Sequence, residues 1–255
     1  HSTMEPMNCT ARLTGDTLEL WVGTQTPQLA AYTAAYYADV PKDNVIVHST
    51  FLGGGFGRRS ESDFVAEAAA IAKASGLPIQ LCWSREDDMQ NDRYRPASMA
   101  KFSIGINQQG VIDSWVVKRA GPQLMPYVID NLVDGLMPSI LPNPMVDWLS
   151  KTGYGLYGSL LVDHSSVEGL YEDYDVPHKS SDHVSVDPGL PLGAWRSVGH
   201  SFSGFFKESM IDEVAAQLNQ DAVAFRLKHL NNNPKLANVL RVAADKAGWQ
   251  KPLPA

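Results

Sequence analysis

Residues 44–76 read NVIVHSTFLGGGFGRRSESDFVAEAAAIAKASG and join a strand pattern, a glycine loop and a helix pattern. The apolar stretch 44–51 runs directly into three consecutive glycines. A helix is predicted to follow, because Ser60 and Asp63 resemble a capping box and Gly76 is typical of a helix end. One face of this helix is expected to be apolar, at Phe64, Ala68 and Ile71. The stretch therefore predicts a strand that turns tightly into a helix.

The sequence before and after this stretch predicts further strands and helices. TARLTGDTLELWVGT alternates around Gly15-Asp16, which predicts a hairpin with strands at 9–14 and 17–23. PQLAAYTAAYYADV predicts a helix that starts near Pro27. LPIQLCWS predicts a buried strand, and residues 99–121 predict a hairpin that turns near Gln108-Gln109-Gly110.

The second half of the chain is less regular. Strands are expected at 167–174 and 182–187. Three helices are expected: one at 201–219, one that follows Asp221 as its N-cap, and one at 234–247. In the first of these helices, apolar residues recur every four positions and should face a core: Phe206, Met210, Val214 and Leu218. Prolines and glycines interrupt 121–165, where loops and one short helix near 125–134 are predicted. Strands and helices in this mixed order predict an α+β fold with mixed sheets and packed helices.

Composition and charge limit the classes of protein to which the chain can belong. The chain has 255 residues, of which 44% are hydrophobic, so it can bury a sizeable core. A formal net charge of -7 argues against nucleic acid as a partner, because neutralising phosphates needs a basic excess. No apolar run approaches the roughly 18 residues that a membrane span needs. Cys9 and Cys82 are too far apart for a zinc or iron–sulfur motif and are expected to be small buried side chains, with a single disulfide left open.

The glycine loop has two interpretations. A dinucleotide fingerprint would need a third glycine where Arg58 stands, and no Gly-Lys-Ser/Thr follows, so neither nucleotide motif fits. One interpretation is a tight strand-to-helix turn with glycines at positive φ. The other is a ligand site, because exposed N–H groups, the positive end of the next helix, Arg58 and Arg59 would suit phosphate or another oxyanion. As a structural alternative, the two arginines would form a solvated pair.

Two further loops precede helices. Gln25, in VGTQTPQ, would be a neutral donor toward an oxo group or a side chain that bonds the backbone at the helix entry. Trp195 and Arg196 begin a turn of small polar residues that enters the next helix. His200, in the same turn, is more typical of a hydrogen-bonded structural histidine than of a general base.

Together these motifs resemble a known family. HSTMEPMNCTA, LWVGTQTPQ, LGGGFGRR, PIQLCWSREDDMQNDRYRP and AWRSVGHS…FFKESMIDEVA follow one another from His1 to about residue 230. The series resembles the molybdopterin-binding large subunit of the xanthine dehydrogenase family, nearest to the isoquinoline 1-oxidoreductase beta subunit and bacterial aldehyde dehydrogenases. The whole chain, residues 1–255, is then expected to be a fragment of the molybdopterin-binding region. Two subdomains are allowed, with 121–165 between them.

The resemblance implies cofactors and roles. Gln25 matches the glutamine that bonds a molybdenum oxo ligand, and Gly54, Gly55, Phe56 and Gly57 match the loop over the metal. Arg58 is included among the expected cofactor contacts, and Arg196 matches the arginine that orients substrate. The cofactor is expected to be molybdenum-molybdopterin, in the cytosine dinucleotide form, with the metal held by the dithiolene rather than by protein ligands. The reaction implied is the oxidation of aldehydes or N-heterocycles with water as oxygen source.

The resemblance also implies partners and limits. A small iron–sulfur subunit carrying [2Fe-2S] clusters would take the electrons, and the protein would lie in the periplasm or at the cell envelope, with the cytoplasm as the alternative. In this family the glutamate that acts as the base lies far downstream, and Glu5 is not its counterpart. The isolated chain is therefore expected to be inactive. Ser60 replaces an acidic residue that some relatives use to grip purines, which disfavours purine substrates. The alternative function is a non-catalytic assembly or anion-binding domain that uses the same loops.

Overall fold

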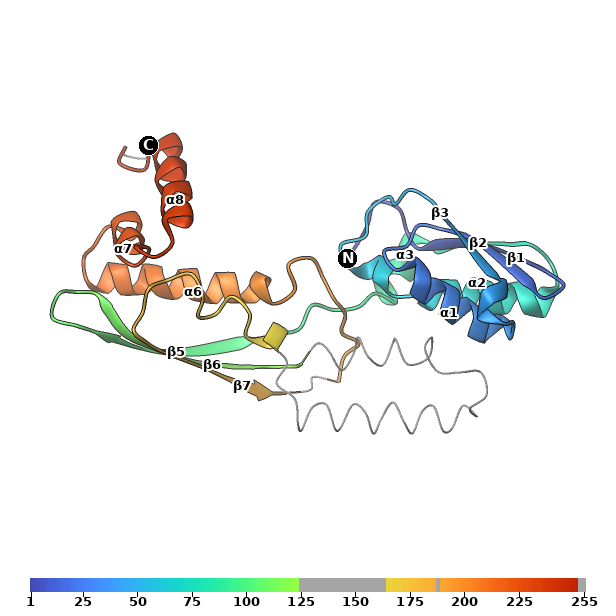
Figure 1. The fold of residues 1–255 in the computed structure, drawn as a ribbon, viewed down its shortest axis with the longest axis horizontal. Helices are drawn as coiled ribbons and strands as arrows, with labels where there is room; N and C mark the ends of the chain where they lie inside the picture. Colours follow the sequence, from blue (N-terminus) through green and yellow to red (C-terminus); the bar gives the residue numbers. More distant parts are fainter. Residues whose placement is uncertain (124–163, 187–188, 252–255) are drawn as a thin grey trace. The chain divides into compact units, whose positions relative to one another are not determined.

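The computed structural model describes residues 1–123, 164–186 and 189–251, and these divide into two compact units. Residues 1–96, 123 and 189–196 belong to the first unit, and 97–122, 164–186 and 197–251 belong to the second. Each unit therefore combines segments that are far apart in the sequence (Figure 1). The predicted short helix near 125–134 lies outside the described residues.

The first unit contains a four-stranded mixed sheet in the order β3-β2-β1-β4. Its strands are β1 (Asn8–Thr14), β2 (Thr17–Val22), β3 (Val45–Ser49) and β4 (Ile79–Cys82). β1 pairs antiparallel with β2 and with β4, whereas β2 pairs parallel with β3. The predicted hairpin and the strand before the glycines are confirmed. Leu18, Leu20 and Val22 alternate with less buried residues along β2, so one face of the sheet carries the core.

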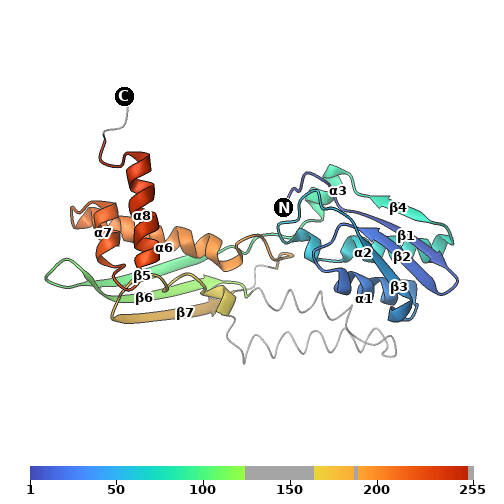
Figure 2. The same cartoon turned by 45° about the horizontal axis from the view of Figure 1, so that its top comes forward.

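Two alanine-rich helices cover that face. The helical elements of the unit are α1 (Pro27–Ala38), η1 (Lys42–Asn44), η2 (Arg58–Ser60), α2 (Asp63–Ser75) and α3 (Arg85–Gln90). Figures 1 and 2 show α1 and α2 side by side on one side of the sheet. Ala30, Ala34, Ala68 and Ala72 are fully buried, and their small side chains let the two helices approach closely. The core of the unit therefore lies between these helices and the sheet.

Three predictions for this unit are wrong in detail. The helix after the glycines begins at Asp63 rather than at Ser60, which lies in the 3-10 turn η2. Ile71 is 42% exposed and does not share the buried face of Phe64 and Ala68, because α2 packs along its alanines. β4 is an edge strand rather than a buried one, so Cys82 is exposed and remains a free thiol, as does the buried Cys9.

The second unit contains a three-stranded mixed sheet in the order β5-β6-β7. Its elements are β5 (Met99–Ile106), β6 (Ile112–Gly121), η3 (His164–Ser166), β7 (His178–Ser185), α6 (Val198–Gln217), α7 (Ala222–Lys228) and α8 (Pro234–Ala247). β5 and β6 form the predicted hairpin, and β6 pairs parallel with β7. α6 lies along the sheet in Figure 1, with Met210 buried and Phe206, Val214 and Leu218 packed against the same core. Asp221 caps α7 as predicted, accepting from the Ala224 N–H at 2.8 Å.

The predicted strand at 167–174 is wrong. Leu170 and Tyr174 are buried as a strand pattern requires, but Gly169 and Asp173 have φ of +80° and +78°. These left-handed residues turn the backbone, so the segment enters the core as a series of turns. The next strand begins earlier than predicted, at His178. The α+β class with mixed sheets and packed helices is confirmed in both units, and no helix among the described residues has the length and apolar character needed to cross a bilayer.

A buried histidine joins α7 to the sheet of the second unit. His229 Nε2 accepts from the Ile112 N–H at 2.9 Å, so its Nδ1 carries the proton and donates to the Phe225 carbonyl at 2.8 Å. Burial lowers the pKa of His229, and the neighbouring Lys228 acts in the same direction, against the Phe225 bond and Asp175. Protonation of Nε2 as well would remove the acceptor of the Ile112 N–H hydrogen bond. His229 is therefore neutral in the fold.

We expect acid to weaken the second unit through this residue. Below about pH 6.5 the unfolded chain takes up a proton that folded His229 resists, so the free energy of unfolding should fall as pH falls toward the depressed pKa. Urea unfolding followed by circular dichroism from neutral to mildly acidic pH measures this loss. His229→Gln should flatten the pH dependence, whereas His48→Gln, at an exposed site of the first unit, should not. Parallel pH curves for wild type and His229→Gln would contradict the assignment.

Candidate functional site

The loop between β3 and η2 has an unusual backbone. Gly54, Phe56 and Gly57 have φ of +104°, +57° and +107°. Phe56 is a bulky residue in the left-handed region, which costs about 1–2 kcal/mol relative to an ordinary conformation. Its side chain is nevertheless 43% exposed, so burial of the ring does not offset this cost. Contacts from other segments must hold the loop in this shape.

Gln25 provides one of these contacts from the loop after β2. Its Oε1 accepts a hydrogen bond from the Gly57 N–H at 3.1 Å. A Cβ at position 55 would stand 2.5 Å from the same oxygen, so only glycine permits this approach. Because the oxygen faces the loop, the two protons of Nε2 remain available, and they have no partner among the described residues. Gln25 is thus an exposed, anchored hydrogen-bond donor.

The segment Ala194–Arg196 provides a second contact. The Arg196 N–H donates to the Phe56 carbonyl at 2.7 Å. A Cβ on Gly57 would lie only 1.9 Å from the Ala194 carbonyl oxygen, so the two backbones touch directly. The Trp195 ring stacks on His1 with centroids 4.3 Å apart, and Arg95 lies 5.0 Å from its centroid. The exposed Arg196 side chain therefore begins at the glycine loop.

Arg59 fixes the loop from beneath. It is fully buried, and its Nε donates to the Gly54 carbonyl at 2.8 Å. Nη1 donates to the Gly23 carbonyl at 3.0 Å, and Nη2 donates to the carbonyls of Glu5 and Pro6 at 3.0 and 3.2 Å. Nη2 also meets the Glu5 carboxylate at 2.9 Å. One guanidinium therefore joins the glycine loop to the N-terminal segment and to the end of β2.

Glu5 completes this arrangement. Its carboxylate accepts from the Gly53 N–H at 2.7 Å and from the Asn8 side chain at 3.0 Å. Burial alone would raise the pKa of Glu5, but these two bonds and the Arg59 charge together bring that pKa below its ordinary value. Glu5 is consequently a charged structural partner of the loop.

Arg58 is also fully buried. Its Nη1 and Nη2 bond the two carboxylate oxygens of Asp63 at 2.9 and 2.7 Å, and its Nε lies 3.3 Å from an oxygen of Asp92. The guanidinium also lies 5.4 Å from the Trp83 ring centroid. The alternative of a solvated arginine pair at 58 and 59 is therefore wrong, because both side chains are 0% exposed. A cofactor contact by Arg58 stays a prediction.

The predicted site residues thus divide into two groups. Gln25, Gly54, Gly55, Phe56, Gly57 and Arg196 come together around one loop. Arg58 lies behind it. The expected helix N-terminus does not lie at the glycines, because η2 separates them from α2. Sequence reasoning missed Asp63 and Asp92 as partners of Arg58. The available signal was general: a buried arginine needs acidic or carbonyl acceptors, but no spacing rule identifies them.

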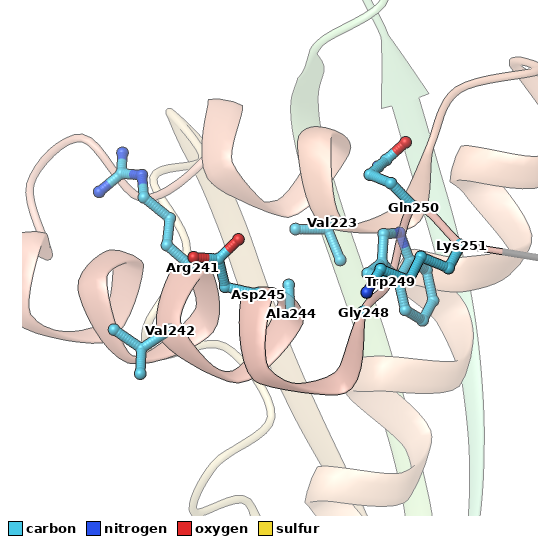
Figure 3. A pocket seen from close by; sticks show the side chains of 9 residues that line it. All are labelled: Val223, Arg241, Val242, Ala244, Asp245, Gly248, Trp249, Gln250 and Lys251. Atoms are coloured by element: carbon cyan, nitrogen blue, oxygen red, sulfur yellow. The ribbon is translucent and has the colours of Figure 1, made fainter.

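Two other observations limit the site. No group of three or more His, Cys, Asp or Glu in the described part of the chain could hold a metal ion. A hollow of about 510 Å³ in the second unit is lined by residues of α7, α8 and the turn after it, among them Val223, Arg241, Asp245 and Trp249 (Figure 3). None of the predicted site residues lines that hollow. The glycine loop remains the candidate site.

Comparison with known proteins shows what the chain resembles. Residues 1–121 match the family model of the molybdopterin cofactor-binding domain. Isoquinoline 1-oxidoreductase subunit beta of Brevundimonas diminuta is 28% identical over 249 residues, which are 97% of this chain and 29% of that protein. The xanthine dehydrogenase molybdenum-binding subunit of Escherichia coli O157:H7 is 26% identical over 90% of this chain and 27% of its own length. The predicted resemblance to molybdopterin-binding subunits is confirmed.

Further relatives agree with this assignment. The membrane-bound aldehyde dehydrogenase (pyrroloquinoline-quinone) of Gluconacetobacter polyoxogenes is 27% identical over 98% of this chain and 32% of its own length. The solved aldehyde oxidoreductase of Desulfovibrio gigas has the same fold, with a TM-score of 0.71 at 17% identity over 96% of this chain and 26% of that one. The chain therefore spans about a third or less of the length of these relatives.

Gly57 is expected to tolerate no side chain. Gly57→Ala would combine positive φ with a Cβ 1.9 Å from the Ala194 oxygen, so we expect it to lower the free energy of unfolding by about 3 kcal/mol or more. Gly76→Ala is the matched control, because its φ is +66° but nothing lies within 4 Å of the added Cβ. The control should cost about 1–2 kcal/mol, from backbone strain alone. Equal losses in urea unfolding would show that the Ala194 contact contributes nothing.

Arg59 should be far more important than an exposed arginine. Arg59→Ala leaves several buried carbonyl groups without a donor, at about 1–3 kcal/mol each, so we expect a loss of at least about 3 kcal/mol. Arg12→Ala is the control: Arg12 pairs with Glu19 on the surface of the same sheet, a type of pair that contributes about 0–1 kcal/mol. Chemical denaturation of both variants tests the difference. Similar stabilities for the two variants would contradict the role given to Arg59.

Proposed function

We propose that this chain forms the cofactor-facing part of a molybdenum hydroxylase that oxidises aldehydes or N-heterocycles with water as oxygen source. The observation that carries the proposal is the Gln25 amide. Its oxygen accepts from the Gly57 N–H, so the amide of this exposed side chain is anchored at the loop and its N–H groups remain available as donors. A neutral donor held rigidly at a side-chain-free loop is suited to an oxygen atom of a bound group.

The residues present fit molybdenum-molybdopterin, which brings its own sulfur ligands for the metal. At Gly55 and Gly57 an added Cβ would collide with Gln25 or Ala194, so the backbone is bare on either side of the exposed Phe56 ring. A planar or oxygen-bearing group could approach such a surface closely. The bound cofactor would supply the two-electron oxidation that protein side chains cannot perform. The cytosine dinucleotide form of this cofactor is part of the proposal and follows from the family resemblance.

Each residue then has a role. Gln25 would donate from Nε2 to an oxygen of the cofactor, and Gly54 to Gly57 would permit its approach. Phe56, held in the left-handed conformation, would place its ring against the cofactor or substrate. Arg196 would orient the substrate and stabilise negative charge that develops on it. Arg58, which is enclosed by Asp63 and Asp92, would act through the shape of the loop.

The remaining parts of the proposal come from the resemblance. A small iron–sulfur subunit with [2Fe-2S] clusters would accept the electrons. In the family that the chain resembles, the glutamate that acts as the base lies far downstream, so we propose that the 255-residue chain alone does not turn over substrate. The periplasm or cell envelope is the proposed location, with the cytoplasm as the alternative.

Metal analysis of the complete subunit, expressed with its iron–sulfur partner under cofactor-competent conditions, tests the function. We expect near-stoichiometric molybdenum and pterin and dye reduction with an aldehyde or N-heterocycle. Gln25→Ala should lower molybdenum content or turnover by about 10–100-fold, the usual effect of removing a group that positions a metal centre. Gln28→Ala, at an exposed position on α1, is the control and should change neither.

The possible outcomes separate the two functions. Absence of molybdenum after such expression would favour the non-catalytic assembly or anion-binding domain. Molybdenum with an inert Gln25→Ala substitution would retain the cofactor but contradict the role of Gln25. Turnover by the 255-residue chain reconstituted alone would contradict the need for a distant glutamate.

A further inference from the structure

A polar pocket lies in the first unit beside the turn that follows η2. It has a volume of about 210 Å³ and lies at α1, α2 and the turn that joins η2 to α2. Its polar lining consists of Thr33, Tyr37, Glu61, Ser62, Asp63 and Arg93, and we call it the Glu61 pocket. Tyr37 is 40% exposed, whereas Thr33, Glu61 and Ser62 are buried, so the pocket is a recess with a wet rim. None of these residues is among those assigned to the cofactor.

Two buried polar atoms in this pocket lack hydrogen-bond partners in the described part of the chain, namely Ser62 Oγ and Arg93 Nε. The Glu61 side chain lies with them and is only 6% exposed. A buried polar atom left unpaired costs about 1–3 kcal/mol, so two at one recess require an explanation. A bound polar ligand provides one.

The charges around the pocket favour an anion. The nearest acidic neighbour, Asp63, is neutralised by both Nη atoms of Arg58, at 2.9 and 2.7 Å. Arg93, by contrast, forms no ion pair with any described carboxylate. Arg93 and Glu61 both lie next to Gly193, where an added Cβ would be 2.6 Å from Arg93 Cβ and 3.4 Å from Glu61 Oε1. The Arg93 guanidinium thus shares a recess with hydroxyl groups and with the Glu61 carboxyl group, which interacts with its charge.

We propose that the Glu61 pocket binds a small carboxylate anion together with one proton. The planar guanidinium of Arg93 matches the two oxygens of a carboxylate. Glu61, when protonated, and Ser62 become O–H donors toward the same anion. Since a water molecule occupies about 30 Å³ of liquid volume, the pocket has room for an acetate-sized ion. The bound anion then lies against the Arg93 charge, and Arg93 Nε and Ser62 Oγ acquire hydrogen-bond partners.

Proton uptake follows from the environment of Glu61. Burial raises the pKa of Glu61 to about 7; Arg93 and Arg58 oppose this increase, and Asp63 adds to it. Near neutral pH the carboxyl group can therefore take up a proton when an anion arrives. Above its pKa, deprotonated Glu61 would repel the anion. Affinity should then fall about tenfold for each pH unit above pH 7.

Isothermal titration of the 255-residue chain with sodium acetate tests the proposal, with sodium chloride at equal ionic strength as the salt control. We expect acetate to bind at pH 6, to bind progressively more weakly at alkaline pH, and to show a heat that depends on buffer ionisation because a proton is taken up. Arg93→Gln should weaken binding at least about tenfold by removing the charged fork. Lys73→Gln, an exposed cation on α2 that pairs with Asp39, is the matched control and should bind like wild type.

Glu61→Gln separates the proton from the anion. The glutamine amide keeps a donor but cannot titrate, so this variant should bind acetate with the same affinity at every pH. Circular dichroism of each variant confirms that it is folded. The proposal is overturned if acetate has no more effect than chloride, if acetamide binds as well as acetate, or if folded Arg93→Gln binds like wild type. It is also overturned if Glu61→Gln keeps the pH dependence. None of these outcomes depends on molybdenum.

Discussion

The buried Arg59 guanidinium is the interaction on which the candidate site depends. It donates to carbonyl groups from the N-terminal segment, the end of β2 and the glycine loop, and it meets the Glu5 carboxylate. A buried cation is tolerated only when its donors are satisfied, and here the acceptors are mostly backbone oxygens. Because those oxygens belong to three separate segments, satisfying one side chain also fixes their relative positions. The strained left-handed conformation of Phe56 is held within this framework, between Gly54 and Gly57, which adopt positive φ readily.

The loop is held from its other side by close backbone contact. Gly57 meets the Ala194 carbonyl, Phe56 accepts from the Arg196 N–H, and Gln25 accepts from the Gly57 N–H. Gly57 is therefore required sterically by a backbone neighbour, whatever ligand is bound. This arrangement also fixes the function that each side chain can perform. Gln25 has its oxygen committed to the loop and its amino group free to donate, and Arg58 has its charge committed to Asp63 and Asp92.

Much of the fold could be predicted because it follows local rules. The hairpin about Gly15 and the helix ends at Gly76 and Gly248 depend on turn and cap residues that lie next to the elements they limit. The prediction of a strand at 167–174 was wrong because Gly169 and Asp173 adopt positive φ within an apolar run. Burial of Leu170 and Tyr174 was implied correctly, but the path of the backbone was not. Periodicity shows which residues face a core, and it does not show whether the chain reaches that core as a strand or as turns.

The sequence by itself indicated the resemblance to molybdopterin-binding subunits, the mixed α+β fold and the identity of the loop residues, since ordered motifs and glycine positions can be recognised without any knowledge of contacts. It also placed Gln25 and Arg196 with that loop through resemblance. Only the tertiary structure decided that Arg58 and Arg59 are buried side chains that bond neighbouring segments. It also decided that Glu5 is a partner of the loop and that Glu61 and Arg93 share a recess. The physical reason is that the charge of a side chain is local, whereas its solvation and its acceptors come from segments distant in sequence. An arginine in a glycine-rich loop reads as a ligand contact until its neighbours are known.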